Sequence, residues 1–248
     1  MAQPDEKMLL ARLGDLERAA SRGRGAFFSR FLDPQELAVF NRAPRPSCEV
    51  MAWGGYEGSE RQMLGFFPDY AEPQAAAFPL CALRAECAEE LGHRTLLGAL
   101  MSQGIERSLI GDIAKEEDGS AVLFVCDSIA DFIQMNVTRA GRSRLTLLPV
   151  PIEKLRLRER AWEPVSGTVA SLRLDCVLGL LTGQSRAAVE ELLRREQVSV
   201  NFAVCTKGSV SLACGDVLSV RHFGRAELLE IGGESRKGRI WITLKRYV

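Results

Sequence analysis

The stretch that decides the fold lies between Ser171 and Arg225. It contains, in order, Leu172-Arg173-Leu174-Asp175-Cys176-Val177-Leu178, Ser185-Arg186-Ala187-Ala188-Val189-Glu190-Glu191-Leu192-Leu193-Arg194-Arg195 and Val198-Ser199-Val200-Asn201. Apolar residues recur at helical spacing in the first two segments, which predicts two short amphipathic helices that pack on each other. Gly183 supplies the turn between them and Ser185 the N-cap of the second. The alternation of Val198 and Val200 predicts a half-buried strand.

Basic residues lie at the ends of these predicted elements. Arg173 and Arg186 start the two helices, Arg194-Arg195 close the second, and Lys207 follows in a loop. Arg221 and Arg225 bracket a predicted strand that ends in Phe223-Gly224. Because a guanidinium group binds phosphate through two parallel hydrogen bonds, such a row suits a sugar-phosphate backbone. Each arginine taken alone is explained as well by a solvated charged surface.

The same stretch resembles the S-four RNA-binding domain, which is named after a small-subunit ribosomal protein. The likeness rests on Arg173-Leu174-Asp175, on Ser185-Arg186 with the alanine-rich helix, on Val198-x-Val200-Asn201 and on Gly215-Asp216-Val217-Leu218-Ser219-Val220. It implies a module that binds structured RNA through its two-helix face. Glu196-Gln197 stands where that family usually has glycine, which takes a left-handed cap without strain. Glutamate there costs conformational energy and brings a negative charge near the RNA face.

The charges divide unevenly along the chain of 248 residues, although Lys+Arg 32 equals Asp+Glu 32. Residues 1–137 hold 13 basic and 21 acidic side chains, a net charge of −8, and residues 138–248 hold 19 and 11, a net charge of +8. This polarity predicts that the C-terminal half meets a polyanion.

The cysteines and histidines give no sign of a metal site. There are seven cysteines without a Cys-x-x-Cys pair and two histidines, so we expect no metal and no cofactor. Most cysteines lie in apolar runs and are interpreted as small hydrophobic residues. With no signal peptide and no apolar run of membrane-spanning length, we expect a cytoplasmic protein that does not contact membranes.

Residues 1–74 predict an N-terminal domain of mixed helices and strands. Met8–Leu16 has one apolar helical face, and Asp33-Pro34 is typical of a helix start. Val50–Trp53 and Met63–Phe67 predict strands. The pair Gly54-Gly55 is interpreted as a turn and not as a phosphate loop, because no Gly-Lys-Ser/Thr follows it.

Residues 75–150 predict the order β-α-β-β-α-β of a ferredoxin-like domain, as in RNA-recognition motifs. The expected elements are strand 78–87, helix 94–103, strands 110–114 and 121–125, helix 129–137 and strand 145–150. Phe124 is the single aromatic residue in the third strand, so the stacking signature of single-strand RNA readers is missing. The fold class we expect is therefore α+β, with a mixed N-terminal domain, this central domain and a C-terminal S-four domain at 171–248 that ends in a β-hairpin.

Residues 151–170 are interpreted as a basic linker. Lys154, Arg156, Arg158 and Arg160 alternate, so an extended segment would place all four on one side. A phosphate track and a charge-protected strand edge are equally good explanations of this pattern. Arg236 and Lys237, in the loop between two strands predicted at 226–231 and 239–244, add to the basic surface.

Blocks along almost the whole chain resemble the YlmH family of bacterial proteins. They are Phe31-Leu32-Asp33-Pro34-x-Glu36, Gly54-Gly55-Tyr56 with Glu60-Arg61, His93-Arg94-x-x-Leu97-Gly98-Ala99-Leu100-Met101, Gly104-Ile105-x-Arg107 and Ile110-Gly111-Asp112-Ile113. The resemblance implies a monomeric factor that binds large-subunit ribosomal RNA in rescue or quality control of subunits holding peptidyl-tRNA. Expected partners are that RNA, tRNA and quality-control proteins. The RNA contacts it implies are Arg173, Ser185, Arg186, Arg194, Arg195, Asn201, Lys207, Arg221, Arg225, Arg236 and Lys237, and the partner or tRNA contacts are Arg61, His93, Arg94 and Arg107.

Enzymatic alternatives fit the chain less well. Arg173-Leu174-Asp175 also resembles the catalytic stretch of pseudouridine synthases, but the residues after Asp175 are too few to build that enzyme's pocket. A methyltransferase would need a glycine-rich loop between a strand and a helix, which the chain lacks. We therefore expect a non-enzymatic protein, with an RNA-binding assembly or regulatory factor acting off the ribosome as the alternative.

Overall fold

The structure is a computed structural model that describes residues 4–23, 25–87, 91–159, 161–235 and 238–247. The chain forms two compact units, Met1–Arg158 and Glu159–Val248. The helices of the first unit are α1 (Pro4–Ser21), α2 (Pro34–Arg42), α3 (His93–Ser102) and α4 (Asp127–Asn136). Its strands are β1 (Phe27–Phe28), β2 (Glu49–Trp53), β3 (Met63–Phe67), β4 (Leu80–Glu86), β5 (Ile110–Lys115), β6 (Ala121–Cys126), β7 (Arg139–Ala140), β8 (Ser143–Arg144) and β9 (Thr146–Val150).

The start of α2 confirms the predicted cap. The carboxylate of Asp33 accepts hydrogen bonds of 2.9 Å from the backbone N–H groups of Gln35 and Glu36. The carboxylate of Glu36 in turn accepts one of 2.8 Å from the N–H of Asp33, which completes a capping box. With Pro34 in the first turn, the helix needs no tertiary contact to define where it begins.

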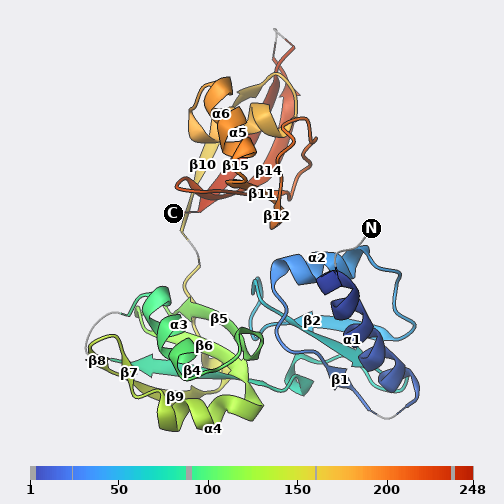
Figure 1. Ribbon diagram of the computed structural model, residues 1–248, viewed down its shortest axis with the longest axis vertical. Helices are drawn as coiled ribbons and strands as arrows, with labels where there is room; N and C mark the ends of the chain where they lie inside the picture. The colour runs from blue at the N-terminus through green and yellow to red at the C-terminus, as the bar shows by residue number, and fades with distance from the viewer. Residues whose placement is uncertain (1–3, 24, 88–90, 160, 236–237, 248) are drawn as a thin grey trace. The chain divides into compact units, whose positions relative to one another are not determined.

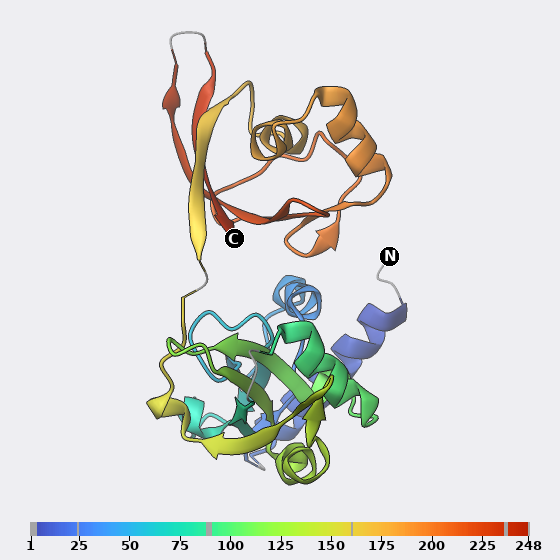
Figure 2. The same ribbon diagram turned by 90° about the vertical axis from the view of Figure 1, so that its left-hand side faces the viewer.

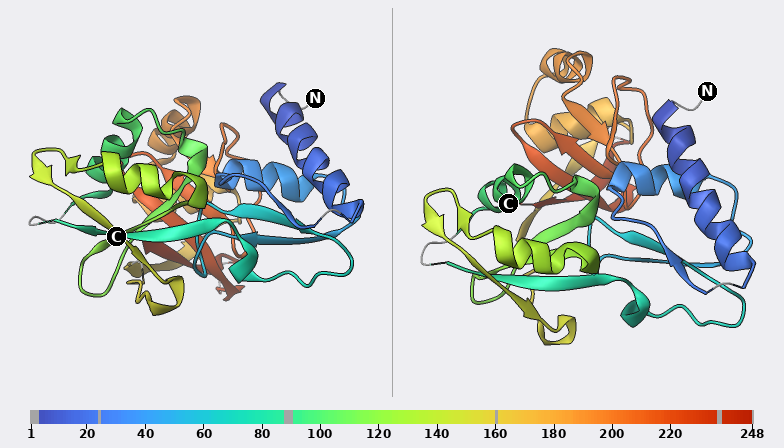
Figure 3. Two further views of the ribbon diagram at one scale, coloured as in Figure 1. Left: turned by 90° about the horizontal axis from the view of Figure 1, so that it is seen from below. Right: turned by 60° about the horizontal axis from the view of Figure 1, so that its bottom comes forward.

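A three-stranded antiparallel sheet of order β1-β3-β2 forms the N-terminal part of the first unit. Leu9 and Leu13 of α1 pack against Leu64 and Phe66 of β3, and Figure 3 shows α1 beside these strands. Leu9, Leu13 and Leu16 of the predicted apolar face therefore cover this sheet, whereas Met8, which the prediction placed on the same face, is exposed.

The second sheet of this unit has the order β5-β6-β4-β9, and all its neighbours are antiparallel. Helix α3 lies between β4 and β5 in the chain and α4 between β6 and β9, so the β-α-β-β-α-β order expected from the sequence is present (Figure 1). Leu96 and Leu100 of α3 and Ile133 of α4 are buried in one core with Leu83 and Leu123 of the two central strands.

The N-terminal part covers the other face of the same sheet. Phe124 of β6 is fully buried, and the Tyr56 ring lies at a centroid distance of 5.0 Å from it. Gly55 has φ 103°, and a Cβ there would come within 2.2 Å of the Phe124 ring. Gly54-Gly55 is thus a turn that allows close packing, and β6 is buried along its whole length.

The second unit is a six-stranded antiparallel sheet with two helices packed on it. Its elements are β10 (Trp162–Val169), α5 (Leu174–Thr182), α6 (Arg186–Arg194), β11 (Val198–Val200), β12 (Ala203–Val204), β13 (Val217–Val220), β14 (Gly224–Glu234) and β15 (Ile240–Tyr247), with the strand order β10-β15-β14-β13-β11-β12. Figure 2 shows the long β14–β15 hairpin. Leu174, Val177 and Leu178 of α5 share a core with Val189 and Leu193 of α6, as the helical periodicity predicts.

The segment 151–170 differs from the predicted linker. Residues 152–154 form a short 3-10 helix, and Leu157 pairs with Glu116 within the first unit. Residues 162–169 are the edge strand β10 of the second unit, paired with β15 along its length. Lys154, Arg156 and Arg158 therefore do not form one extended basic strand, and Arg160 lies outside the described residues.

The prediction that the cysteines act as small hydrophobic residues is confirmed for some of them and not for all. All seven are free thiols, Cys126 is buried, and Cys214 is exposed. Burial raises the pKa of the Cys81 thiol to about 12 and that of Cys126 to about 11, so both stay protonated near neutral pH.

Candidate nucleic-acid interface

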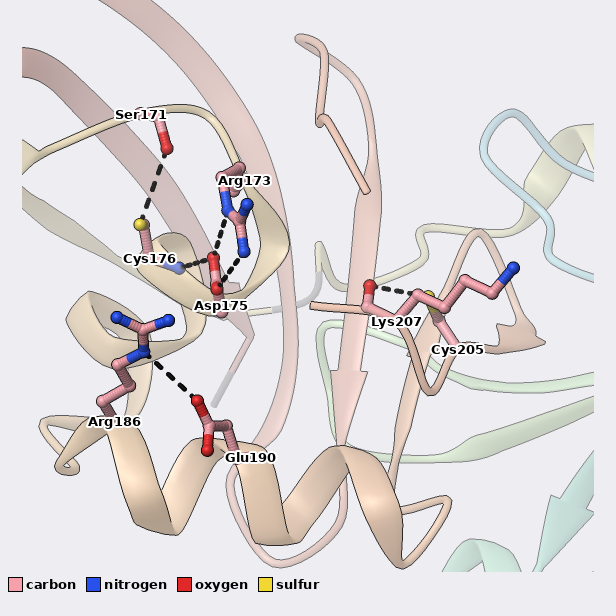
Figure 4. A network of polar contacts seen from close by, with 8 residues as sticks. All are labelled: Ser171, Arg173, Asp175, Cys176, Arg186, Glu190, Cys205 and Lys207. Atoms are coloured by element: carbon pink, nitrogen blue, oxygen red, sulfur yellow. Dashed lines mark hydrogen bonds and ion pairs between the residues drawn. The ribbon is translucent and has the colours of Figure 1, made fainter. Parts of the chain in front are cut away.

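The first cation of the predicted interface, Arg173, is the N-cap residue of α5. Its guanidinium group donates hydrogen bonds of 3.1 and 2.6 Å to the two carboxylate oxygens of Asp175 (Figure 4). The hydrogen bond from Arg173 is the main reason why the pKa of Asp175 is lowered. Asp175 also lies in the first turn of the helix, where its charge is favourable, so it stays ionised and holds Arg173 in place.

The cations of α6 are also paired. Arg186 is bound to Glu190 at 3.2 Å (Figure 4), and Arg194 and Arg195 both bind Glu191 at 2.5 Å. These hydrogen bonds lower the pKa of Glu191. The pairs are exposed, since the Arg186 side chain is 80% and the Arg194 side chain 75% accessible.

These contacts change the electrostatic description of the two helices. Residues 173–196 contain four arginines and four carboxylates, so their net charge is zero. The sequence predicted a row of free guanidinium groups on the two helices, but each of these groups is bound to a carboxylate. Exposed ion pairs are screened by solvent and contribute little to stability, so phosphate oxygens can replace the carboxylates at small cost.

Ser185 and Asn201, which the resemblance implied as RNA contacts, hold the backbone together. The Ser185 hydroxyl accepts a hydrogen bond of 3.4 Å from the N–H of Ala188 and caps α6. The Asn201 side chain donates to Asp216 at 2.7 Å and accepts from the N–H of Val217 at 2.9 Å. Both side chains thus stabilise the backbone that shapes this surface.

Arg221 lies in a turn and Arg225 in the strand β14, so the two do not bracket a strand as the sequence predicted. Residues 221–223 connect β13 to β14, because the Phe223 N–H bonds back to the Val220 carbonyl at 3.0 Å. The Arg225 guanidinium lies 5.0 Å from the centre of the Phe202 ring, within the range of a cation–π contact. Both arginines line a shallow, open hollow of about 490 Å³ together with Glu196, Gln197, Ser199, Ser219, Val220 and Gly224.

Four of the described residues of this unit have positive φ without being glycine: Glu196 at 57°, Asn201 at 47°, Phe202 at 65° and His222 at 71°. The value for Glu196 confirms the left-handed cap predicted at the end of α6. Phe202 follows Asn201 in the tight turn between β11 and β12, where glycine would be free of strain. The residues with positive φ therefore lie at three places: the end of α6, the turn that carries Phe202, and the turn that carries Arg221.

Lys207 lies in a loop that packs against the start of α5. The carbonyl of Gly208 accepts a hydrogen bond of 3.0 Å from the N–H of Asp175. The Lys207 side chain is exposed and extends away from the Cys205 thiol in Figure 4. Arg236 and Lys237, also predicted as RNA contacts, lie outside the described residues.

Two of the cations predicted to contact tRNA or a partner point into the first unit. Arg61 donates to the carbonyls of Ile110 at 3.0 Å and of Phe31 at 3.2 Å. Arg107 donates to the carbonyls of Ile110 at 2.6 Å and Gly111 at 3.1 Å, and burial together with the charge of Arg61 lowers its pKa to about 10. These two groups connect the N-terminal part to the second sheet. His93 and Arg94, in contrast, lie exposed in the first turn of α3.

The charge boundary predicted at residue 137 does not coincide with the boundary of the folded units. Residues 1–158 hold 19 basic and 22 acidic side chains, a net charge of −3, and residues 159–248 hold 13 and 10, a net charge of +3. Much of the basic excess lies at 138–158, inside the first unit. Sequence reasoning missed Arg139, Arg142 and Arg144 there, although three arginines within six residues around Gly141 were a visible signal.

Comparison with known proteins identifies the family. A family model described as "Putative RNA-binding domain in YlmH" matches residues 83–154. The "Ribosome-associated protein quality control protein P2" of Bacillus subtilis (strain 168) is 32% identical over 246 residues, which cover 98% of this chain and 95% of that protein. The chain belongs to the YlmH family. This confirms the resemblance of the sequence blocks.

A solved structure from the same family is similar in fold. The cell division protein YlmH from Streptococcus pneumoniae has a TM-score of 0.53 and 21% identity to this chain. The match covers 62% of this chain and 96% of that one. At this identity the likeness concerns the fold alone.

No helix in the described part of the chain is long and apolar enough to cross a membrane. Within the same ranges, no three His, Cys, Asp or Glu side chains gather in a way that could hold a metal ion.

Proposed function

We propose that this protein is a non-enzymatic RNA-binding factor of ribosome-associated quality control that docks on large-subunit ribosomal RNA while peptidyl-tRNA is retained. The observation that carries the proposal is the 32% identity to the quality-control protein of Bacillus subtilis, which extends over 98% of this chain. The RNA-binding family model at residues 83–154 supports RNA as the partner. We further propose tRNA and quality-control proteins as partners and a monomeric free state.

We propose that residues 171–248 are an S-four RNA-binding domain. Support comes from the two helices α5 and α6, the Ser185 cap and the strand β11 in the order that the motif requires. The exposed guanidinium groups of Arg173, Arg186, Arg194 and Arg195 would carry the contact, with Lys207 beside α5. In the same scheme, residues 1–74 are the mixed N-terminal domain and 75–150 a ferredoxin-like domain.

Ion-pair exchange would control how this surface binds. A phosphate group that replaces Glu190 or Glu191 gains charge-assisted hydrogen bonds from guanidinium groups that already extend from a packed helix. Because the surface of α5 and α6 is neutral overall, attraction from a distance is weak and geometry decides which RNA fits. The ionised, paired state of Asp175 in the first turn of α5 fits a structural role at the helix N-terminus better than a catalytic one.

The test is sedimentation of tagged full-length protein in cell lysate through a sucrose gradient. The Arg186→Glu/Arg194→Glu variant reverses two of the most exposed cations of α6. A control, Arg12→Glu/Arg22→Glu, makes the same charge change at exposed positions of the N-terminal part. We expect the wild type and the control to migrate with large subunits, with enrichment where peptidyl-tRNA is retained, and the α6 variant to stay at the top.

Either of two results would overturn the proposal. One is wild-type protein that remains at the top of the gradient at low salt. The other is an α6 variant that co-migrates as the wild type does. Thermal melts of both variants exclude unfolding as the cause of a loss.

A further inference from the structure

The RNA-binding family match at residues 83–154 raises the question of which surface there meets RNA. RNA-recognition motifs with this strand order bind single strands by stacking bases on aromatic residues of the sheet. That face is closed in this protein. Phe124, the aromatic residue of the central strand β6, is fully buried beneath Tyr56, and Phe31, Met63 and Phe67 belong to the same core. The opposite face packs against α3 and α4.

Most of the remaining surface of this segment repels or cannot reach a phosphate backbone. Helix α4 contains Asp127 and Asp131 and no lysine or arginine. The turn between β5 and β6 carries Glu116, Glu117 and Asp118. Of the arginines in the segment, Arg84 binds Glu116, and Arg107 is directed at backbone carbonyls. The arginines of the segment that remain are Arg94 and the three of the β7–β8 hairpin, and the hairpin is where they are most concentrated.

The β7–β8 hairpin concentrates three arginines. Arg139 in β7 and Arg144 in β8 are directly opposite each other in the antiparallel ladder, and Arg142 lies in the turn. All three are exposed, and no ion pair joins them to a carboxylate of the described residues. The Arg139 guanidinium group donates a hydrogen bond of 3.3 Å to the carbonyl of Arg142. Like charges at opposite positions of a β-ladder are destabilising, and a bound polyanion would remove that cost.

The hairpin is nevertheless fixed to the unit. Val137, Ala140 and Leu145 are buried in the core beneath α3 and α4. The Leu145 N–H donates a hydrogen bond of 2.9 Å to the Thr138 carbonyl and closes the base of the hairpin. The three arginines therefore extend from a backbone that packing holds in one position.

The first turn of α3 lies beside this hairpin. A Cβ at Gly141 would be 3.4 Å from Cγ2 of Thr95, so the hairpin turn contacts the residue that follows Arg94. Gly141 has φ 61°, which glycine adopts without strain and which permits this close turn. Because Thr95 contacts the hairpin turn, the preceding residue Arg94, which is exposed, lies near the hairpin arginines.

We propose that Arg139, Arg142 and Arg144, together with Arg94, bind the sugar-phosphate backbone of double-stranded RNA. This would be a second RNA contact, on the first unit, that acts through charge and bidentate guanidinium–phosphate bonds and not through base stacking. It deepens the proposed RNA-binding function and rests on it, but it does not depend on the contact through α5 and α6.

The experiment measures binding of full-length protein to a fluorescein-labelled RNA stem-loop and to a single-stranded oligouridylate, by anisotropy at several salt concentrations. The variant is Arg139→Ala/Arg142→Ala/Arg144→Ala. The matched control, Arg12→Ala/Arg22→Ala/Arg45→Ala, removes the same charge from exposed positions of the same unit. We expect the hairpin variant to bind the stem-loop about tenfold more weakly and its salt slope to be lower by about two to three units. The control should keep the wild-type slope, and the oligouridylate should bind more weakly than the stem-loop.

A third variant, Arg139→Lys/Arg142→Lys/Arg144→Lys, keeps the charge and should retain the slope, which separates charge from loss of folding. Equal losses in the hairpin variant and the control would overturn the proposal, as would a hairpin variant that binds as the wild type does. A preference for the oligouridylate would also overturn it. If sedimentation with ribosomes fails while this difference holds, the ribosomal target is wrong and the hairpin contact stands.

Discussion

Two groups of arginines in this protein differ in what lies beside them. On α5 and α6, Arg173, Arg186, Arg194 and Arg195 are each bound to a carboxylate. On the β7–β8 hairpin, Arg139, Arg142 and Arg144 lie within six residues that contain no acidic side chain. The first group has no net charge within residues 173–196, and the second carries three positive charges.

The comparison shows that the exposure of an arginine does not by itself predict how much that arginine contributes to RNA binding. A paired arginine is held in place by its carboxylate and exchanges that carboxylate for a phosphate group when RNA binds. Such a site favours RNA whose phosphate groups match the positions of the arginines. Unpaired arginines raise the local potential and release counterions when RNA binds, which gives affinity with strong salt dependence. The following predictions test this contrast, from the largest expected effect to the smallest.

The buried pair Arg84–Glu116 shows what pairing contributes inside a unit. The Glu116 side chain is only 6% exposed, and Arg84 donates hydrogen bonds of 2.6 and 2.8 Å to it. In Arg84→Ala the carboxylate loses this partner, so we expect the free energy of unfolding to fall by about 2 kcal/mol, below the usual cost because Arg84 itself is partly exposed. Urea unfolding measures this, and Arg186→Ala, which removes an exposed partner, should cause no measurable change.

The same pair makes stability depend on pH. Arg84 lowers the pKa of Glu116 below its ordinary value of 4.5, so the unfolded chain binds the proton more readily than the folded one. The contribution is fully present above pH 4.5 and is lost as the pH falls through the lowered pKa. The stability difference between wild type and Arg84→Ala should therefore shrink in acid. A difference that stays constant down to pH 2 would contradict this assignment.

Replacement of Glu196 should stabilise the second unit. Its φ of 57° costs an ordinary residue roughly 1 kcal/mol, and glycine avoids that cost. Glu196→Gly should raise the free energy of unfolding by about 1 kcal/mol in urea titrations, while Gln197→Gly, at the next position, should lower it. Glu196→Gly also changes the net charge of residues 173–196 from zero to +1, so the surface of α6 becomes positively charged, as the β7–β8 hairpin is. Equal effects at both positions would show that the strain is absent.

Removal of one carboxylate should release two paired arginines. Glu191 binds both Arg194 and Arg195 at 2.5 Å, so Glu191→Gln leaves two exposed cations available. We expect affinity for the RNA stem-loop to rise on the order of threefold, with a steeper salt slope. Glu49→Gln makes the same charge change in the first unit at an exposed position and should alter neither quantity. An unchanged affinity in Glu191→Gln would mean that RNA does not contact the end of α6.

The smallest effect is expected at the hairpin, where stability and binding should change in opposite directions. Arg144→Thr removes the like charge opposite Arg139 and should stabilise the protein by about 0.3 kcal/mol. The same variant should bind the stem-loop more weakly, because one phosphate contact is lost. Arg144→Lys should leave both quantities near wild type. A loss of stability in Arg144→Thr would show that Arg144 serves the fold and not RNA.

Sequence reasoning succeeded where a structure depends on neighbours along the chain. The cap at Asp33, the cap at Ser185 and the left-handed residue Glu196 were all predictable, because each conformation is set within a single helical turn. The ion pairs of α6 were predictable too, since Glu190 and Glu191 stand at helical spacing from Arg186 and Arg195. The sequence prediction considered the arginines and left their carboxylate neighbours out.

Other properties depend on residues that only packing brings together. The sequence identified Phe124 as a lone strand aromatic, but its burial under Tyr56 requires the N-terminal part to cover the sheet. Arg61 is a cation by sequence, and only the fold shows that it binds the carbonyls of the distant residues Ile110 and Phe31 and so connects two segments of the first unit. Division of the chain at residue 137 gives net charges of −8 and +8, whereas division at the boundary of the folded units gives −3 for the first unit and +3 for the second.

The sequence by itself thus determined the main helices, the caps at Asp33 and Ser185, the β-α-β-β-α-β order of residues 75–150 and the family of this protein. The tertiary structure alone decided which arginines are neutralised across the fold, which sheet face is closed, and that Arg139 stands opposite Arg144. The physical reason is the range of the interactions. Hydrogen bonds within one turn are fixed by local spacing, whereas the desolvation and pairing of a charge depend on every segment that folds against it.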